Sequence, residues 1–174
     1  AGTFKPVKSE TIGEHAMHGE HFSISKSTIK SLLDNKNIIA VGTTSARTLE
    51  SLYWIGVQLS KTIKPVNHIF EISQWSVYEI PSDITKSESL KETLNYLNDK
   101  KLDILHCKTS IIIVPGYKFR MINQLITNFH QPSSTLLLLI AALVGDSWKD
   151  IYDHALKNNY RFLSYGDSSL LYGK

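Results

Sequence analysis

The sequence has a single cysteine, Cys107, which excludes an internal disulfide and a zinc site built on several cysteines. A lone cysteine favours a reducing compartment, so we expect a cytoplasmic protein. Long apolar runs are also lacking. The longest covers residues 136–144, whereas a membrane-spanning helix needs about 20 residues. The sequence therefore predicts no membrane partner.

Glycine and proline are scarce, with 9 and 5 among 174 residues, which argues against a collagen-like or low-complexity chain. Neither sign of charge is in large excess, because 19 Lys and Arg against 16 Asp and Glu give a formal net charge of +3. This balance permits a polyanionic partner without requiring one. The only arginines are Arg47, Arg120 and Arg161, so specific recognition of an anion would depend on these three.

The length fits one domain over residues 1–174, and the apolar pattern predicts an α/β fold. Short apolar or alternating runs predict strands at 20–25, 38–41, 111–114, 125–127 and 160–163. Helical spacing predicts helices at 27–35, 46–54, 87–97, 136–143 and 147–157. We expect Gly56 to end the second helix. We also expect the strands ending at Gly42 and Val114 to lie side by side and open into one pocket. Residues 57–105 contain no pattern that points to a catalytic or binding site.

The first polar cluster is the segment 14–20, in which His15, His18 and Glu20 can accept or donate a proton. On a helix the two histidines would share a face, and on a strand His18 and Glu20 would. Two histidines and a glutamate are also the ligands of some zinc sites, although the spacing is not HExxH. An acid–base site, a metal-dependent hydrolase using these three residues and a solvated loop all stay open.

The second cluster follows the strand 38–41, where Gly42, Thr43 and Thr44 open a helix that carries Arg47 near its start. Free backbone N–H groups at a helix N-terminus and a guanidinium that can bind two oxygens favour a carboxylate or a phosphate. The pattern is neither the dinucleotide-binding glycine motif nor a P-loop. Ordinary N-capping beside a surface arginine is the structural alternative.

The remaining candidates follow expected strands or precede an expected helix, and they are Tyr117, Asn128, Phe129, His130, Ser133, Tyr165 and Asp167. Asn128 can bind an amide or a base edge, and His130 can move a proton near pH 7. Asp167 can accept a proton or bind a ribose hydroxyl. Core packing of Phe129 and a turn role for Asp167 are the structural alternatives.

Taken in order, six segments resemble the carboxy-terminal part of the S-adenosylmethionine:tRNA ribosyltransferase-isomerase family. They are AGTFKPV (1–7), EHAMHGE (14–20), AVGTTSARTLES (40–51), PGYKF (115–119), LITNFHQPSSTLLLLIAAL (125–143) and YRFLSYGDSSLL (160–171). The resemblance implies the C-terminal part of a mixed α/β, barrel-like domain, with the family's inserted β-barrel domain absent. It also implies that the chain is half of a larger enzyme, so we expect the isolated chain to be incomplete and inactive.

The resemblance further implies a reaction of queuosine biosynthesis. The family transfers and isomerises the ribosyl moiety of S-adenosylmethionine onto 7-aminomethyl-7-deazaguanine at the wobble position of tRNA with a GUN anticodon. Epoxyqueuosine-tRNA forms, and adenine and methionine leave. S-adenosylmethionine is thus a consumed substrate, and neither a cofactor nor a metal is implied.

Two groups of candidate residues follow from this chemistry. The catalytic candidates are His15, His18, Glu20, His130 and Asp167. The candidates for binding S-adenosylmethionine or the deazaguanine are Gly42, Thr43, Thr44, Arg47, Tyr117, Asn128, Phe129, Ser133 and Tyr165. Asn123 stands where an aspartate is expected, which argues against an acid–base role there. A non-catalytic RNA- or nucleotide-binding fragment, or a degenerate homologue, is the second function that the sequence leaves open.

Overall fold

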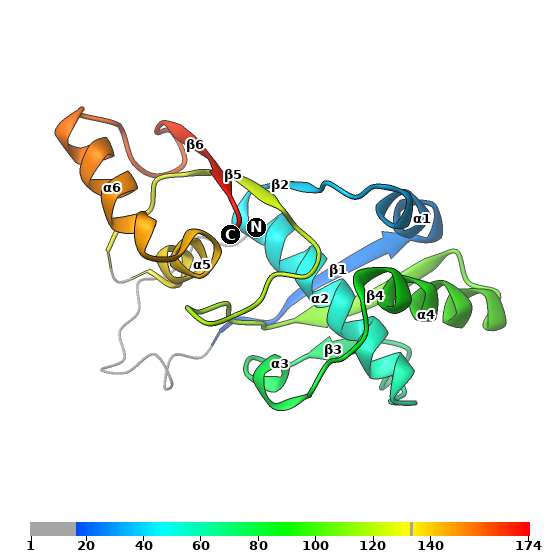
Figure 1. Cartoon of the computed structure of the whole chain (residues 1–174). Helices are drawn as coiled ribbons and strands as arrows, with labels where there is room; N and C mark the ends of the chain where they lie inside the picture. Colours follow the sequence, from blue (N-terminus) through cyan, green and yellow to red (C-terminus); the bar gives the residue numbers. More distant parts are fainter. Residues whose placement is uncertain (1–16, 133) are drawn as a thin grey trace.

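The computed structural model describes residues 17–132 and 134–174, and it has a mixed α/β fold in which the long helix α2 contacts both of two small sheets (Figure 1). The first half of the described chain contains β1 (Glu20–Ser25), α1 (Lys26–Asp34), β2 (Ile39–Val41), α2 (Thr43–Ser60), β3 (Phe70–Ile72) and α3 (Ser76–Glu79). The second half contains α4 (Lys86–Asp99), β4 (Ile104–Thr109), β5 (Gln124–Asn128), α5 (Thr135–Val144), a 3-10 turn (Gly145–Ser147), α6 (Trp148–Lys157) and β6 (Ser168–Tyr172). The predicted α/β class is confirmed.

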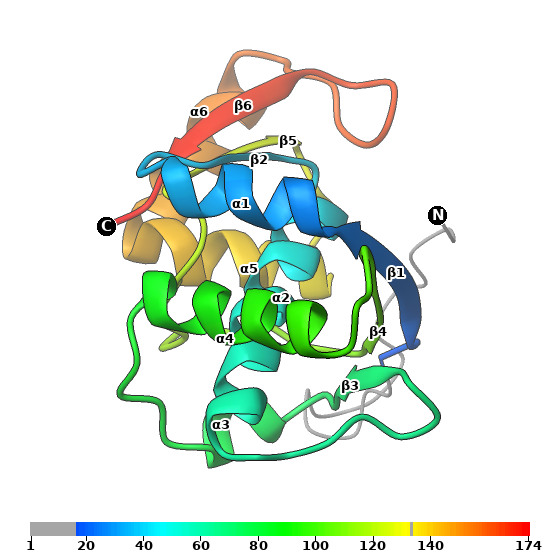
Figure 2. The same cartoon turned by 90° about the vertical axis from the view of Figure 1, so that its right-hand side faces the viewer.

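One sheet has the strand order β1-β4-β3, with β1 antiparallel and β3 parallel to β4. Because side chains alternate along a strand, Ile24, Leu105 and Phe70 point into the core beside α2 and α4. His21 and His106 belong to the alternate set and are exposed. Figure 2 shows α1 and α4 lying across this part of the molecule, with β3 and the loop before it at its lower edge.

The other sheet has the order β2-β5-β6, in which β2 is parallel and β6 antiparallel to β5. The predicted strand 38–41 is confirmed. Ile39 and Val41 are 49% and 66% exposed, while Ala40 between them is buried. Because side chains alternate along a strand, one face of β2 is covered by the core and the other is open to solvent.

Helix α2 does not end at Gly56, contrary to the sequence prediction. A Cβ at Gly56 would come within 2.1 Å of Ser89 Oγ and 2.2 Å of the Ser89 carbonyl oxygen on α4. The glycine therefore permits close packing of the two helices rather than a turn. Ser89 Oγ donates a hydrogen bond to the Tyr53 carbonyl across this contact (2.7 Å). This packing offsets the cost of about 1 kcal/mol that glycine carries relative to alanine within a helix.

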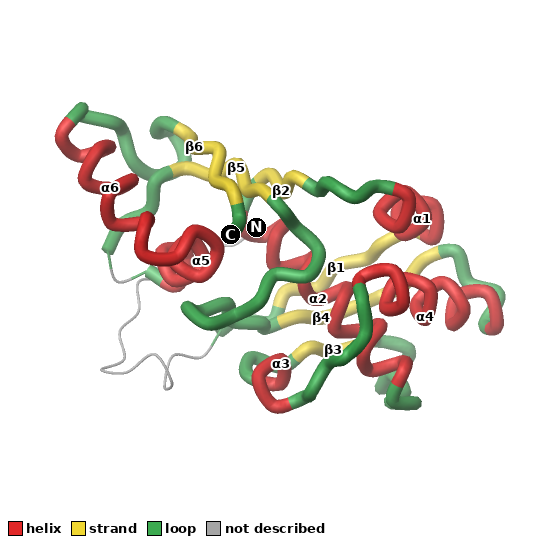
Figure 3. The backbone as a smooth tube through the Cα atoms, in the orientation of Figure 1, coloured by secondary structure: helices red, strands yellow, loops and turns green. Residues whose placement is uncertain are grey.

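Two predicted strands, 111–114 and 160–163, are wrong. Ile111, Ile112 and Ile113 are buried, but they lie in the loop between β4 and β5, which runs against α2 (Figure 3). Residues 160–163 form a loop whose Leu163 N–H binds the Phe129 carbonyl (2.9 Å), and β6 is the last strand. At 111–113 the apolar run reflects burial, which irregular backbone can provide as well as a strand. At 160–163 it does not, because Tyr160 and Leu163 are exposed.

The other elements match their predictions closely. Strands 20–25 and 125–127 and helices 27–35, 87–97, 136–143 and 147–157 are present, with ends shifted by a few residues. Helix α4 owes its start to a capping box between Thr85 and Glu88. No helix in the described part of the chain is long and apolar enough to cross a membrane.

Candidate functional site

The carboxyl ends of β2 and β5 meet at one edge of their sheet, next to the start of α2. The Gly42 N–H donates to the Ile126 carbonyl (2.8 Å), which places the residues that open α2 beside Thr127 and the loop that follows it. Gly42 has φ +85°, a conformation that favours glycine, and it leads directly into the first helical turn. Thr43 is buried there and Thr44 is exposed. This edge is where open α/β sheets bind ligands.

Arg47 lies in the second turn of α2 and is only 3% exposed. Its Nη1 donates to Glu20 Oε1 at the start of β1 (3.1 Å), and its Nε donates to the Ile111 carbonyl (3.1 Å). The guanidinium therefore joins three separate segments, including the one that leads to Val114. The expectation that strands ending at Gly42 and Val114 lie side by side is wrong, because 111–114 is a loop. Arg47 still joins the start of α2 to this loop at Ile111.

The second terminal nitrogen of Arg47, Nη2, is buried and has no hydrogen-bond partner, the only such side-chain atom among the described residues. Burial lowers the pKa of Arg47, and the charge and hydrogen bond of Glu20 oppose this effect. An unpaired buried donor costs about 1–3 kcal/mol, and more when it is charged. The site therefore holds one donor that is suited to an oxygen of an anionic ligand.

The N-terminal cluster is described only in part. Glu20 is paired with Arg47, and His18 is exposed, two residues after the undescribed segment 1–16. Just before it, the Met17 N–H donates to Gln74 Oε1 (2.9 Å). His15 lies outside the described residues. Within the described part of the chain no group of three His, Cys, Asp or Glu side chains is placed to hold a metal ion.

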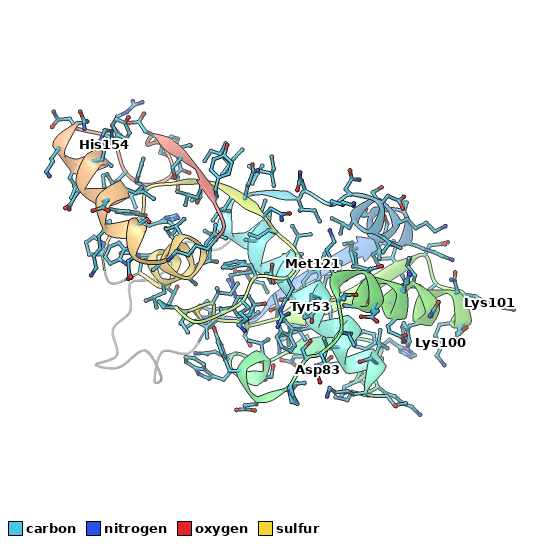
Figure 4. The ribbon with its side chains drawn as sticks, viewed as in Figure 1. Tyr53, Asp83, Lys100, Lys101, Met121 and His154 are labelled. Carbon is cyan, nitrogen blue, oxygen red and sulfur yellow. The ribbon has the colours of Figure 1, made fainter. Side chains whose placement is uncertain are left out.

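A buried carboxylate that the sequence did not single out organises the adjacent loop. Glu50 is fully buried on α2, and its two oxygens accept the backbone N–H groups of Arg120, Met121 and Ile122 at 2.9–3.2 Å. Its Oε2 also accepts the hydroxyl of Tyr117 (2.9 Å). Burial raises the pKa of Glu50, and these hydrogen bonds act against that rise. Figure 4 labels Met121 near the centre of the molecule.

Tyr117 is therefore held deep inside, with its hydroxyl also accepting a hydrogen bond from Trp54 Nε1 (2.9 Å). Burial is the largest cause that raises the pKa of Tyr117 well above its usual value, so the hydroxyl stays protonated. The Tyr117 hydroxyl thus donates one hydrogen bond to Glu50 and accepts one from Trp54, both within the protein. No sequence pattern marked Glu50, because a glutamate within an amphipathic helix is normally a solvated residue.

His130 lies just beyond β5, and its Nε2 is 3.1 Å from Thr127 Oγ1. Its backbone N–H donates to the Tyr152 hydroxyl (3.1 Å). Burial lowers the pKa of His130 to about 4, so the ring is neutral at pH 7. In this form His130 is suited to accept a proton or a hydrogen bond.

This low pKa predicts a contribution of His130 to pH-dependent stability. The unfolded histidine binds a proton below about pH 6.5 and the folded one only near pH 4, so stability falls as the pH drops through that window. After allowance for the partial exposure of the ring, we expect a loss of about 1–2 kcal/mol. Urea unfolding at pH 7 and pH 4.5 measures it, with His130→Gln as the control. An equal pH dependence in the two proteins would contradict the assignment.

The other late candidates hold the 160–168 loop together. Asn128 Nδ2 donates to the Gly166 and Asp167 carbonyls (3.3 and 3.4 Å), so it joins the end of β5 to this loop. Asp167 accepts the Arg161 N–H (2.7 Å), which is the first cause of its lowered pKa. Phe129 is buried among Tyr152, Tyr160 and Phe162, whereas Tyr165 is 98% exposed. Ser133 lies outside the described residues.

The described candidates thus fall into two neighbouring groups, one at the start of α2 and one around His130 and the 160–168 loop. Gly42, Thr43, Arg47 and Glu20 surround the start of α2, and Thr127 joins this group to His130 through the contact between β2 and β5. Asp167 binds Arg161, and its carboxylate contacts no imidazole of the residues that the structure describes. The geometry gives one helix N-terminus and one neutral imidazole at the edge of the β2-β5-β6 sheet. The cationic donor, Arg47, is held one turn further along α2, between Glu20 of β1 and Ile111.

Comparisons with known proteins give the family. The family model described as "Queuosine biosynthesis protein" matches residues 1–171. A relative in Cupriavidus pinatubonensis, named S-adenosylmethionine:tRNA ribosyltransferase-isomerase, is 37% identical across 98% of this chain and 38% of its own length. A relative of the same name in Burkholderia cenocepacia is 35% identical, with 98% and 39% covered. The chain therefore spans less than two fifths of the length of these curated relatives.

A solved structure supports the same assignment. The crystal structure of S-adenosylmethionine tRNA ribosyltransferase from Thermotoga maritima matches with a TM-score of 0.53 and 27% identity. The match covers 86% of this chain and 39% of that one. Since the family model covers nearly every residue, the chain belongs to the queuosine biosynthesis family of S-adenosylmethionine:tRNA ribosyltransferase-isomerases.

Proposed function

We propose that the chain forms part of a cytoplasmic enzyme that transfers and isomerises the ribosyl moiety of S-adenosylmethionine onto 7-aminomethyl-7-deazaguanine in tRNA. The acceptor is the wobble base of a tRNA with a GUN anticodon, and the products are epoxyqueuosine-tRNA, adenine and methionine. S-adenosylmethionine is consumed, with no cofactor or metal assigned. The observation that carries this proposal is the family match over residues 1–171.

The start of α2 is the proposed site for the methionine carboxylate of S-adenosylmethionine. Arg47 Nη2 is buried, cationic and unpaired, and Nη1 and Nε are fixed by Glu20 and Ile111. A carboxylate oxygen on Nη2 would supply the missing partner in a charge-assisted hydrogen bond. Gly42, Thr43 and Thr44 add the positive end of the helix dipole at the same sheet edge.

The proton transfers are assigned to the histidines. The reaction needs a base to remove a proton beside the sulfonium and an acid to protonate the departing adenine. His130 is neutral at pH 7 because burial lowers its pKa, so it is proposed as the base, with a basicity below that of an ordinary histidine. The exposed His18, and His15 beside it in sequence, are the proposed acid candidates.

The remaining candidates have narrower proposed roles. Glu20 pairs with Arg47 and so positions it, and Asp167 and Asn128 shape the 160–168 loop beside His130. Phe129 packs in the core, and Tyr117 fixes the loop before β5. Tyr165 is free to contact the sulfonium or the acceptor base.

The proposal is tested by adenine release. The full gene product that contains this chain is incubated with S-adenosylmethionine and with tRNA that carries 7-aminomethyl-7-deazaguanine, and adenine is quantified by chromatography. We expect release of adenine only when this tRNA is present. Release without tRNA, or binding of tRNA with no adenine formed, would contradict the proposal and favour a hydrolase or a non-catalytic RNA-binding fragment respectively.

A further inference from the structure

Two adjoining hollows flank a hairpin tip on the side of the molecule away from α6. One, of about 440 Å³, lies between the hairpin and the exposed side chains of β1 and β4. The other, of about 540 Å³, lies between the hairpin, the end of α2 and the end of α4. Asn67 and His68 line both of them, so the two hollows meet at the tip, and together they are called the groove. Figure 2 shows the loop between α2 and β3, which contains the hairpin, along the lower edge of the molecule.

The charge of this groove is of one sign. The lysines and histidines that line it are Lys64, Lys100, His21, His68 and His106, and no aspartate or glutamate lines it among the described residues. Lys108 lies nearby but is paired with Glu71 (2.8 Å), so it adds no free charge. Figure 4 shows Lys100 at the exposed end of α4. A polyanion is the partner that fits such a lining.

At the hairpin tip, His68 occupies a position whose backbone conformation favours glycine. Val66 and Ile69 exchange two backbone hydrogen bonds (3.2 and 2.9 Å), and Asn67 and His68 between them have φ +50° and +64°. This is the geometry of a two-residue type I′ turn, whose second central position favours glycine. His68 therefore carries a conformational cost that glycine would not, and its side chain is the part exposed to the groove.

The groove also has flat and apolar surfaces beside its cations. Tyr96, Pro65 and Ile63 line the hollow that holds both lysines. Unpaired RNA is bound by this combination, since phosphates pair with lysines and exposed bases stack on aromatic or imidazole rings. A double-stranded RNA would pair its phosphates with the lysines but would offer no free bases to stack on these rings.

We propose that this groove binds a single-stranded segment of the substrate tRNA, with phosphates at Lys64 and Lys100 and a base against His68. The inference rests on the proposed function, which makes tRNA a substrate. It assigns tRNA binding to a surface formed by β1, β4, the hairpin and the ends of α2 and α4. The start of α2, where S-adenosylmethionine is proposed to bind, is not part of that surface.

The test measures the affinity of the full gene product for the precursor tRNA by fluorescence anisotropy at several salt concentrations. Lys64→Glu with Lys100→Glu should raise Kd at least about tenfold and lower the slope of log Kd against log salt by about 1–2. His68→Gly should raise Kd about fivefold or more through the lost stacking. It should leave the melting temperature unchanged or raised, because glycine suits the turn.

The matched control is Lys149→Glu with Lys157→Glu on α6, which makes the same change of charge at exposed positions on the opposite end of the molecule (Figure 4, where His154 marks α6). Unchanged tRNA affinity in the groove variants, or an equal loss in the control, would overturn the groove assignment. Adenine release by the wild type separates the two proposals. If the wild type releases adenine and the groove variants keep the same KM for tRNA, only the groove is wrong. If the wild type releases none, the proposed function fails.

Discussion

Replacing Glu50 with alanine is expected to lower the free energy of unfolding by more than about 4 kcal/mol. The carboxylate is fully buried and accepts four hydrogen bonds, from Tyr117 and from three consecutive backbone N–H groups. Its removal leaves buried donors unpaired, at about 1–3 kcal/mol each, and opens a cavity beside α2. Urea unfolding followed by circular dichroism measures the change on the 174-residue chain.

Two further variants make this prediction specific. Glu50→Gln keeps one acceptor oxygen but turns an NH2 group toward backbone N–H donors, so its loss should be smaller than that of alanine and still exceed about 2 kcal/mol. Glu88→Ala removes an exposed glutamate from the capping box of α4 and should cost much less than Glu50→Ala. A cost below about 1 kcal/mol for Glu50→Ala would show that the buried network does not hold the 117–122 loop.

Arg47→Ala should weaken binding of S-adenosylmethionine at least about tenfold while tRNA affinity changes little. A charge-assisted contact contributes roughly 1.5–3 kcal/mol, which corresponds to about a tenfold to hundredfold change in Kd. Isothermal titration of the full gene product with S-adenosylmethionine measures this. Arg47→Lys should recover only part of the affinity, because an ammonium cannot hold Glu20, Ile111 and a ligand in the same planar arrangement.

The control for Arg47 is Arg120→Ala. The Arg120 side chain is exposed and lies over the ring of Tyr53, 5.7 Å from its centroid, so its removal deletes an arginine away from the start of α2. We expect unchanged affinity for S-adenosylmethionine. If Arg47→Ala binds S-adenosylmethionine as tightly as the wild type, the free Nη2 has no part in holding this substrate.

The sequence predicts well those features that local patterns determine. The helix that buries residues 136–143 and the alternating strand 20–25 are present because hydrophobic period and capping act over a few neighbours. Arg47 was identified for a similar reason, since a glycine and two threonines marked a helix start beside it. Strands β3, β4 and β6 escaped prediction. In β4 the buried residues include the polar Thr109, so no apolar alternation marks the strand.

Features that depend on distant contacts were not predictable in this way. Gly56 looked like a helix end, and its true role depends on Ser89 of another helix, 33 positions later in the sequence. Glu50 finds its partners about 70 residues away, in a loop whose apolar start predicted a strand instead. The orphaned nitrogen of Arg47 is visible only once Glu20 and Ile111 are placed around it.

The central claim is that the ribosyl unit, and not the methyl group, of S-adenosylmethionine passes to tRNA. One double-label experiment tests it most directly. The full gene product is incubated with precursor tRNA and with S-adenosylmethionine labelled with ¹³C in the ribose or, separately, in the methyl group, and the tRNA nucleosides are analysed by mass spectrometry. The account predicts that the ribose label appears in the wobble nucleoside and that the methyl label leaves with methionine. Methyl label in the tRNA, or neither label there, would contradict it.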